Sequence, residues 1–199
     1  MNATDEQIER AIEALRAGEL VVFPTETLYG IGCDALNPAA VAKLCAVKQR
    51  PAGKPLAVIL GDIAMAEQLT PALNGPAKRF AEAFWPGPLT LVLPAHPQLP
   101  DAIVEDQMIG LRVTSHPVAA RLSRALGHPI CAPSANPTGL PPTPSTQGAR
   151  AYFGKDVAVY LEDGPRDGQA STVLKPGPPL EILRHGPISE QDLRQLIEE

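Results

Sequence analysis

Apolar residues recur at helical spacing near the start of the chain. Apolar side chains follow Ile8 at three, four and seven residues, which predicts an amphipathic helix over residues 5–17. Thr4 and Gln7 have the spacing of a capping box, and Gly18 ends the periodic stretch. The first predicted element is therefore a helix with one face packed on the rest of the protein.

Short apolar runs and further helical patterns alternate along the rest of the chain. Runs rich in β-branched and aromatic residues predict strands at 20–23, 56–60, 89–93, 109–113, 129–132, 157–161, 171–174 and 180–183. Helical spacing between caps and prolines predicts helices at 38–47, 63–69, 76–84, 117–126, 146–153 and after Ser189. The alternation is irregular, which indicates an α/β fold with one twisted mixed sheet flanked by helices. The length favours a single domain over 1–199.

Composition narrows the class of protein. Proline is about twice as common as usual, 23 of 199 residues, which predicts stiff loops in a folded domain. The net charge of −5 argues against a dedicated nucleic-acid binder, although it allows a local, concave positive cleft. The chain begins without a signal-peptide pattern and has no membrane-length apolar run. Three cysteines without paired spacing complete the expectation of a cytoplasmic protein.

The segment Pro24–Gly32 follows the predicted strand at 20–23 and is unusually rich in hydroxyls and glycines. It contains Thr25, Glu26 and Thr27 before Tyr29 and two glycines. Hydroxyls at a strand end, beside glycines that allow close approach of the backbone, are typical of a ligand site. The alternative is a glycine-rich turn whose threonines cap their own backbone.

Basic residues gather after the helix predicted at 38–47. Lys48 and Arg50, with Lys54 close behind, stand in a loop that contains two prolines and a glycine. A phosphate is the expected ligand, since lysine supplies a point charge and the arginine guanidinium can donate two parallel hydrogen bonds. A solvated basic loop is the alternative.

Polar residues also end two later strands. Ser134 and Asn136 follow the run at 129–132, and their alternation predicts that both side chains leave on the same side. Such a pair can bind a phosphate, a metal-bound water or a carboxylate, while an Asx-turn is the alternative. Arg112, near the end of the strand at 109–113, is a further candidate, although a lone arginine there is more often in a surface ion pair.

Other catalytic patterns are missing from the sequence. It contains no Walker-type phosphate loop, no complete dinucleotide fingerprint and no Gly-x-Ser-x-Gly elbow. The histidines lack metal-ligand spacing, so no metal ligand is predicted. The polar and cationic residues at the ends of the predicted strands suit the positioning and charge stabilisation of a phosphorylated substrate.

Taken together, these segments resemble the YrdC family of threonylcarbamoyl-AMP synthases. The resemblance covers nearly the whole chain and rests on an ordered set of motifs: Pro24–Gly32, 48–51, 85–88, 112–117, 134–136 and 171–173. It implies a YrdC-like fold and the use of ATP, L-threonine and bicarbonate. The implied products are pyrophosphate and threonylcarbamoyl-AMP, which a separate tRNA threonylcarbamoyl-transfer machinery would consume. Mg²⁺ would be bound mainly through the ATP phosphates.

The resemblance also implies roles for individual residues. Lys48, Arg50, Ser134 and Asn136 are the implied catalytic residues. Threonine and bicarbonate would be bound by Thr25, Arg112, Ser134 and Ser171. ATP would be bound by Lys48, Arg50, Asn136, Ser145 and Arg184.

The chain departs from the longer family members in two respects. Two other functions also remain as alternatives. Longer members carry a second C-terminal domain, so a chain ending at Glu199 is expected to be a short form. They also place a histidine on the strand after the basic loop, where this chain has only Val58, Ile59 and Leu60. One alternative is an RNA- or ribosome-binding module, and weak RNA contact is also compatible with an enzyme. The other is a carbamoyl-transfer domain of the hydrogenase-maturation type that uses carbamoyl phosphate.

Overall fold

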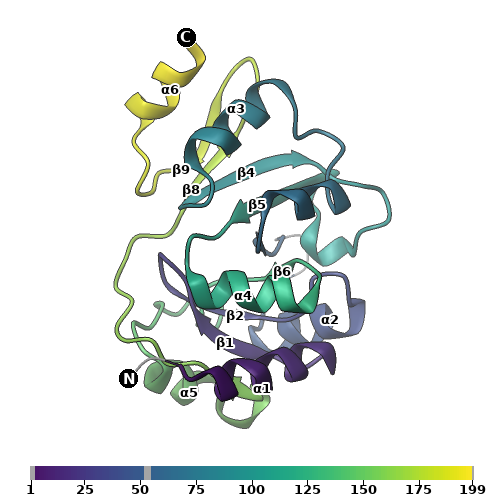
Figure 1. Ribbon diagram of the computed structural model, residues 1–199, viewed down its shortest axis with the longest axis vertical. Coiled ribbons are helices and arrows are strands. Elements are labelled where there is room, and N and C mark those ends of the chain that lie inside the picture. The colour runs from purple at the N-terminus through teal and green to yellow at the C-terminus, as the bar shows by residue number, and fades with distance from the viewer. Residues whose placement is uncertain (1–2, 52–54, 199) are drawn as a thin grey trace.

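The structure, a computed structural model, describes residues 3–51 and 55–198 and has helices on both sides of mixed sheets (Figure 1). Helix α1 (Asp5–Arg16) begins at the predicted capping box, in which Thr4 Oγ1 accepts a hydrogen bond from the Gln7 amide at 3.3 Å. The apolar face of α1 packs with α4 (Pro117–Leu126) over the first strand. Local capping and periodicity thus place the N-terminal helix as predicted.

The remaining helices agree with the predicted pattern, with one change of type. They are α2 (Pro38–Val47), α3 (Gly75–Phe84), α5 (Thr146–Phe153) and α6 (Glu190–Glu198). The segment predicted as a helix at 63–69 is the 3₁₀ helix η1 (Ile63–Gln68), and two shorter 3₁₀ turns are η2 (Asp101–Ile103) and η3 (Gly154–Asp156). Helix α6 packs on α3 through the buried Leu193.

The strands form two hydrogen-bonded sheets, where the sequence predicted one. The smaller sheet has the order β2-β1-β7, and the larger has the order β6-β3-β5-β4-β8-β9. Parallel and antiparallel pairs occur in both, as expected for a mixed fold. The strands are β1 (Val21–Pro24), β2 (Tyr29–Gly32), β3 (Val58–Leu60), β4 (Leu89–Pro94), β5 (Met108–Val113), β6 (Ile130–Cys131), β7 (Val159–Tyr160), β8 (Thr172–Lys175) and β9 (Glu181–Arg184).

The division into two sheets has a local cause around β6. The segment that contains β6 lies between the sheets: it pairs with β3, and its flanks bond to β2 through Ile31 N to Pro133 O at 3.0 Å. Pro129 and Pro133 have no amide hydrogen, so they cannot donate to the ladder that would join the two sheets. The predicted single sheet is therefore interrupted at this place.

Strand β2 was predicted to be part of a ligand-binding loop. The segment is also a regular strand, which pairs with β1 in an antiparallel hairpin whose turn contains residues 25–28. A Cβ atom on Gly32 would lie 2.0 Å from the Cys131 carbonyl oxygen, so this glycine is required for close approach of the neighbouring chain segment rather than of a guest.

The helices of the described residues include none that is long and apolar enough to cross a bilayer.

Candidate active site

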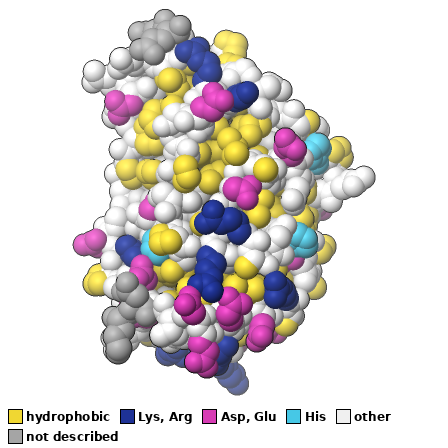
Figure 2. Space-filling model, viewed as in Figure 1, with side chains coloured by type: hydrophobic (Ala, Val, Ile, Leu, Met, Phe, Trp, Pro, Cys, Tyr) yellow, Lys and Arg dark blue, Asp and Glu magenta, His cyan; other side chains and the backbone are white. Residues whose placement is uncertain are grey.

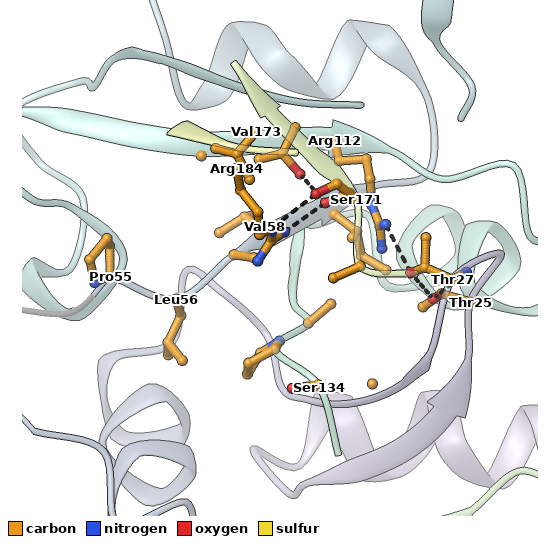
Figure 3. A pocket seen from close by; sticks show the side chains of 18 of the residues that line it. Thr25, Thr27, Pro55, Leu56, Val58, Arg112, Ser134, Ser171, Val173 and Arg184 are labelled. Carbon is orange, nitrogen blue, oxygen red and sulfur yellow. Dashed lines mark hydrogen bonds between the residues drawn. The ribbon is translucent and has the colours of Figure 1, made fainter. Parts of the chain in front are cut away.

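A cavity of about 380 Å³ lies between the two sheets (Figure 3). One wall is formed by the β1–β2 turn, another by residues 55–59 and 132–134, and a third by strands β4, β5, β8 and β9. Predicted site residues from distant parts of the sequence meet here: Thr25, Arg50, Arg112, Ser134, Ser171 and Arg184. The fold thus brings most of the predicted site residues to one place.

Lys48 lies beneath the cavity wall rather than in it. It is 2% exposed at the C-terminal end of α2, and its Nζ donates to the carbonyls of Ser134, at 2.6 Å, and Asn136. Burial, together with the nearby charge of Arg50, lowers the pKa of Lys48 to about 8. In this conformation the ammonium group supports the loop that starts at Ser134.

This lysine should give the protein a pH-dependent stability. The pKa of a lysine in the unfolded chain is about 10.4, whereas the pKa of Lys48 in the folded protein is about 8. Between these values the unfolded chain binds more protons, so the free energy of unfolding should rise with pH, by on the order of 2 kcal/mol. Urea unfolding of wild type and Lys48→Met between about pH 8 and 10 isolates the effect, because methionine does not titrate. A flat or falling difference would contradict the shift.

Among the described residues of the basic loop, Arg50 lines the cavity. Its Nη2 donates to the Pro55 carbonyl at 2.6 Å, which holds the guanidinium across the loop. Burial lowers its pKa, but an arginine remains protonated in a protein. Lys54, the third predicted cation, lies outside the described residues.

Ser134 and Asn136 do not share a direction, contrary to the prediction. Ser134 lines the cavity, whereas the Asn136 Nδ2 donates to the Leu140 carbonyl at 2.6 Å. The prediction fails because β6 ends at Cys131 and the chain turns before Asn136, so strand alternation no longer applies. The Asn136 Oδ1 is buried and has no hydrogen-bond partner within the described residues.

Thr25 contacts its own turn. Its Oγ1 accepts from the Leu28 amide at 3.2 Å and donates to the Leu28 carbonyl at 2.6 Å. A third contact joins it to the Thr27 hydroxyl at 3.0 Å (Figure 3). The self-capping alternative therefore describes these hydrogen bonds, although Thr25 also lines the cavity.

Arg112 is in an ion pair, and the pair is buried rather than at the surface. Its Nη1 lies 3.4 Å from Glu26 Oε1 and donates to Thr27 Oγ1 at 3.2 Å. Burial lowers the pKa of Arg112, and the Glu26 carboxylate opposes that shift. The sequence left the role of Glu26 open because its partner is far along the chain.

Strands β8 and β9 supply a polar corner of the cavity. Arg184 Nε donates to the Ser171 carbonyl at 2.9 Å, and its Nη2 donates to Ser171 Oγ at 3.0 Å (Figure 3). Thr90 Oγ1, on β4, lies 2.8 Å from the same hydroxyl. Thr90 was missed by the sequence analysis because it stands inside an ordinary strand pattern. The structure thus joins Ser171 and Arg184 directly.

Ser145 is separate from the cavity. Its hydroxyl accepts from the Gly148 amide at 3.2 Å and caps helix α5. Of the described residues, those that line the cavity do not include Ser145, Lys48 or Asn136. ATP contact by Ser145 therefore stays a prediction.

A further polar cluster, missed by the sequence analysis, anchors the segment that leads from β7 to β8. The Tyr29 hydroxyl accepts from the Asp163 amide at 2.9 Å, and burial raises the pKa of Tyr29 to about 12. His116 Nε2 lies 2.9 Å from Asp163 Oδ2, and Arg166 also contacts that carboxylate. These contacts connect the two sheets next to the cavity.

The charge around the cavity is mixed. Three arginines line it together with Glu105, and Glu26 lies behind Arg112. The outer face in Figure 2 likewise has Lys and Arg beside Asp and Glu in its lower half, with hydrophobic side chains over much of the upper half. A positive cleft therefore stays an expectation that rests on the arginines.

The chain is similar in sequence to a known protein family and to named members of it. The Sua5/YciO/YrdC family profile, described as telomere recombination, matches residues 13–186. A threonylcarbamoyl-AMP synthase of Chromohalobacter salexigens is 41% identical over 178 residues, which are 85% of this chain and 91% of that protein. The threonylcarbamoyl-AMP synthase of Bacillus subtilis is 39% identical over 202 residues, with 99% of this chain covered.

A solved structure has the same fold. Pyrococcus abyssi Sua5 complexed with L-threonine superimposes with a TM-score of 0.91 at 34% identity, over 96% of this chain and 57% of that one. The chain likewise spans 58% of the Bacillus subtilis protein, so it corresponds to part of these longer relatives.

Proposed function

The chain belongs to the Sua5/YciO/YrdC family, and from this premise we propose that it is a threonylcarbamoyl-AMP synthase, a nucleotidyltransferase. The substrates would be ATP, L-threonine and bicarbonate. The product would pass to a separate tRNA-modifying machinery. The observation that supports this best is one cavity that contains Arg50 at one wall and Arg112 with Ser171 at another.

The two arginines suit two different anions. Arg112 comes from β5 and is held by Thr27 and Glu26, which leaves a planar donor group at the cavity for a carboxylate. Arg50 is held by the Pro55 carbonyl on the side of the basic loop, where its guanidinium suits a triphosphate. We infer that threonine binds beside Arg112 and ATP beside Arg50.

The proposed reaction needs little covalent participation by the protein. Bicarbonate takes up a proton and loses water, which gives carbon dioxide. The threonine amine then bonds to the carbon dioxide and loses a proton, which gives a carbamate. A carbamate oxygen then attacks the α-phosphorus of ATP, and the bond to pyrophosphate breaks. Arginines and backbone amides that neutralise the phosphate charge and align the two substrates suit this chemistry.

Mg²⁺ is proposed to enter with ATP. The described residues contain no group of three or more His, Cys, Asp and Glu side chains placed to hold a metal ion. An ion bound to phosphate oxygens and water requires no such group. When bound, it would neutralise phosphate charge, and the arginines of the cavity would position the rest of the nucleotide.

Pyrophosphate release tests the proposal. Purified protein with Mg²⁺ and ATP should release pyrophosphate only when both L-threonine and bicarbonate are added, and L-serine should replace threonine poorly. No release with the complete mixture would overturn the proposal. Release with carbamoyl phosphate in place of threonine and bicarbonate would favour carbamoyl transfer. Salt-sensitive RNA binding without turnover would favour an RNA-binding module.

A further inference from the structure

Glu26 contacts both Arg112, on strand β5, and Thr114, which directly follows that strand. Its Oε1 lies 3.4 Å from Arg112 Nη1, and its Oε2 accepts from Thr114 Oγ1 at 2.6 Å. We propose that Glu26 is a positioning residue that orients the Arg112 guanidinium for the substrate carboxylate. This inference rests on the proposed function for the identity of the substrate, while the orientation of Arg112 is a property of the protein alone.

The burial of Arg112 makes a partner charge necessary. Arg112 is 6% exposed, and its strand partner Ile59 is buried as well. An isolated cation in such a place is costly unless an anion and hydrogen bonds compensate it. Glu26 supplies that anion, and Thr27 supplies a hydrogen-bond acceptor.

The Oε1 atom of Glu26 acts on Arg112 through its charge rather than through a hydrogen bond. This oxygen is buried and has no hydrogen-bond partner within the parts of the chain that the structure describes. Buried polar atoms are nearly always hydrogen-bonded, so an oxygen without a bond requires another reason to be there. Its proximity to Arg112 is that reason, since the attraction between opposite charges does not need hydrogen-bond geometry.

Glu26 is itself held in place. Thr114 Oγ1 donates to the carboxylate and also accepts from the His116 amide at 3.1 Å, so the hydroxyl is fixed by the start of helix α4. The carboxylate is thereby attached to the larger sheet, although Glu26 belongs to the turn of the smaller sheet. Nη1 of Arg112 is thus engaged on the side of the turn, where its bond to Thr27 is drawn in Figure 3, and the guanidinium lies at the cavity wall.

Glu26→Gln tests the inference, because it removes the charge and keeps the shape. The KM for L-threonine should rise about tenfold, while kcat stays within about threefold and the KM for ATP within about twofold. Glu19→Gln is the matched control, since Glu19 pairs with Lys43 at the surface, and it should leave all three constants unchanged. An unchanged threonine KM in Glu26→Gln, or an equal rise in both KM values, would overturn the inference.

Two further measurements keep the test decisive. Thr114→Val removes the support of Glu26 without changing a charge, and it should raise the threonine KM about threefold even if Glu26→Gln folds poorly. The side-chain ¹H–¹⁵N NMR signal of Arg112 Nε, assigned with Arg112→Lys, should shift or broaden in both variants. An NMR signal that is identical in wild type and variants would refute positioning by Glu26, even in a protein without synthase activity.

Discussion

Arg50→Ala is expected to lower the kcat/KM of threonine-dependent pyrophosphate release by about a hundredfold or more. Arg50 lines the cavity from the basic loop, where its guanidinium would face the triphosphate. Negative charge on the phosphates shifts toward pyrophosphate as the bond breaks, and a fixed cation at that place stabilises the transition state more than the ground state. The loss should therefore appear mainly in kcat.

The control for Arg50→Ala is the same substitution at an arginine that does not line the cavity. Arg79 donates to the Leu196 carbonyl and connects α3 with α6, so Arg79→Ala should keep normal activity. Circular dichroism and thermal unfolding of both variants establish that they are folded. An Arg50→Ala enzyme within about fivefold of wild type would show that Arg50 does not act on the reacting phosphate.

Lys48 should behave differently from Arg50, although the two stand in the same predicted basic loop. Its ammonium group is bonded to the carbonyls of Ser134 and Asn136, so its removal affects the loop as well as any phosphate contact. Lys48→Ala should accordingly lose activity and also thermal stability, whereas Arg50→Ala loses mainly activity. Equal melting temperatures for Lys48→Ala and wild type would contradict this structural role.

Features that depend on nearby residues were predictable from the sequence. The capping box of α1 lies where expected, because it uses atoms within three residues of the helix start. Helix α2 follows its predicted range of 38–47 and likewise begins at a local cap. The main strands also follow their apolar runs. The fold class was accordingly predictable without knowledge of distant contacts.

Features that depend on distant residues were not predictable in the same way. Strand β2 contains two glycines and forms because β1 and the segment around Cys131 pack beside it. The pair between Glu26 and Arg112 joins residues of different sheets. The spacing of residues along the sequence cannot predict a contact between such distant positions. The direction of Asn136 depends on where β6 ends, which is set by the prolines on either side of it.

Arg112→Gln is expected to raise the KM for L-threonine by about a hundredfold, the largest effect on this substrate. A buried guanidinium gives a carboxylate two parallel charge-assisted hydrogen bonds, which an amide cannot replace. The substitution also leaves the partly buried Glu26 carboxylate, whose Oε1 is buried, without its partner charge, which lowers the stability of the fold. Arg112→Gln therefore combines a loss of threonine binding with a loss of stability.

The double variant Glu26→Gln with Arg112→Gln separates these effects. Removal of both charges eliminates the unpaired, partly buried carboxylate, so the melting temperature should recover most of the loss seen in Arg112→Gln. The threonine KM should stay as high as in the single variant, because the group that binds the carboxylate is still missing. If threonine binding recovered together with stability, Arg112 would serve only the fold, and the substrate carboxylate would have to bind elsewhere in the cavity.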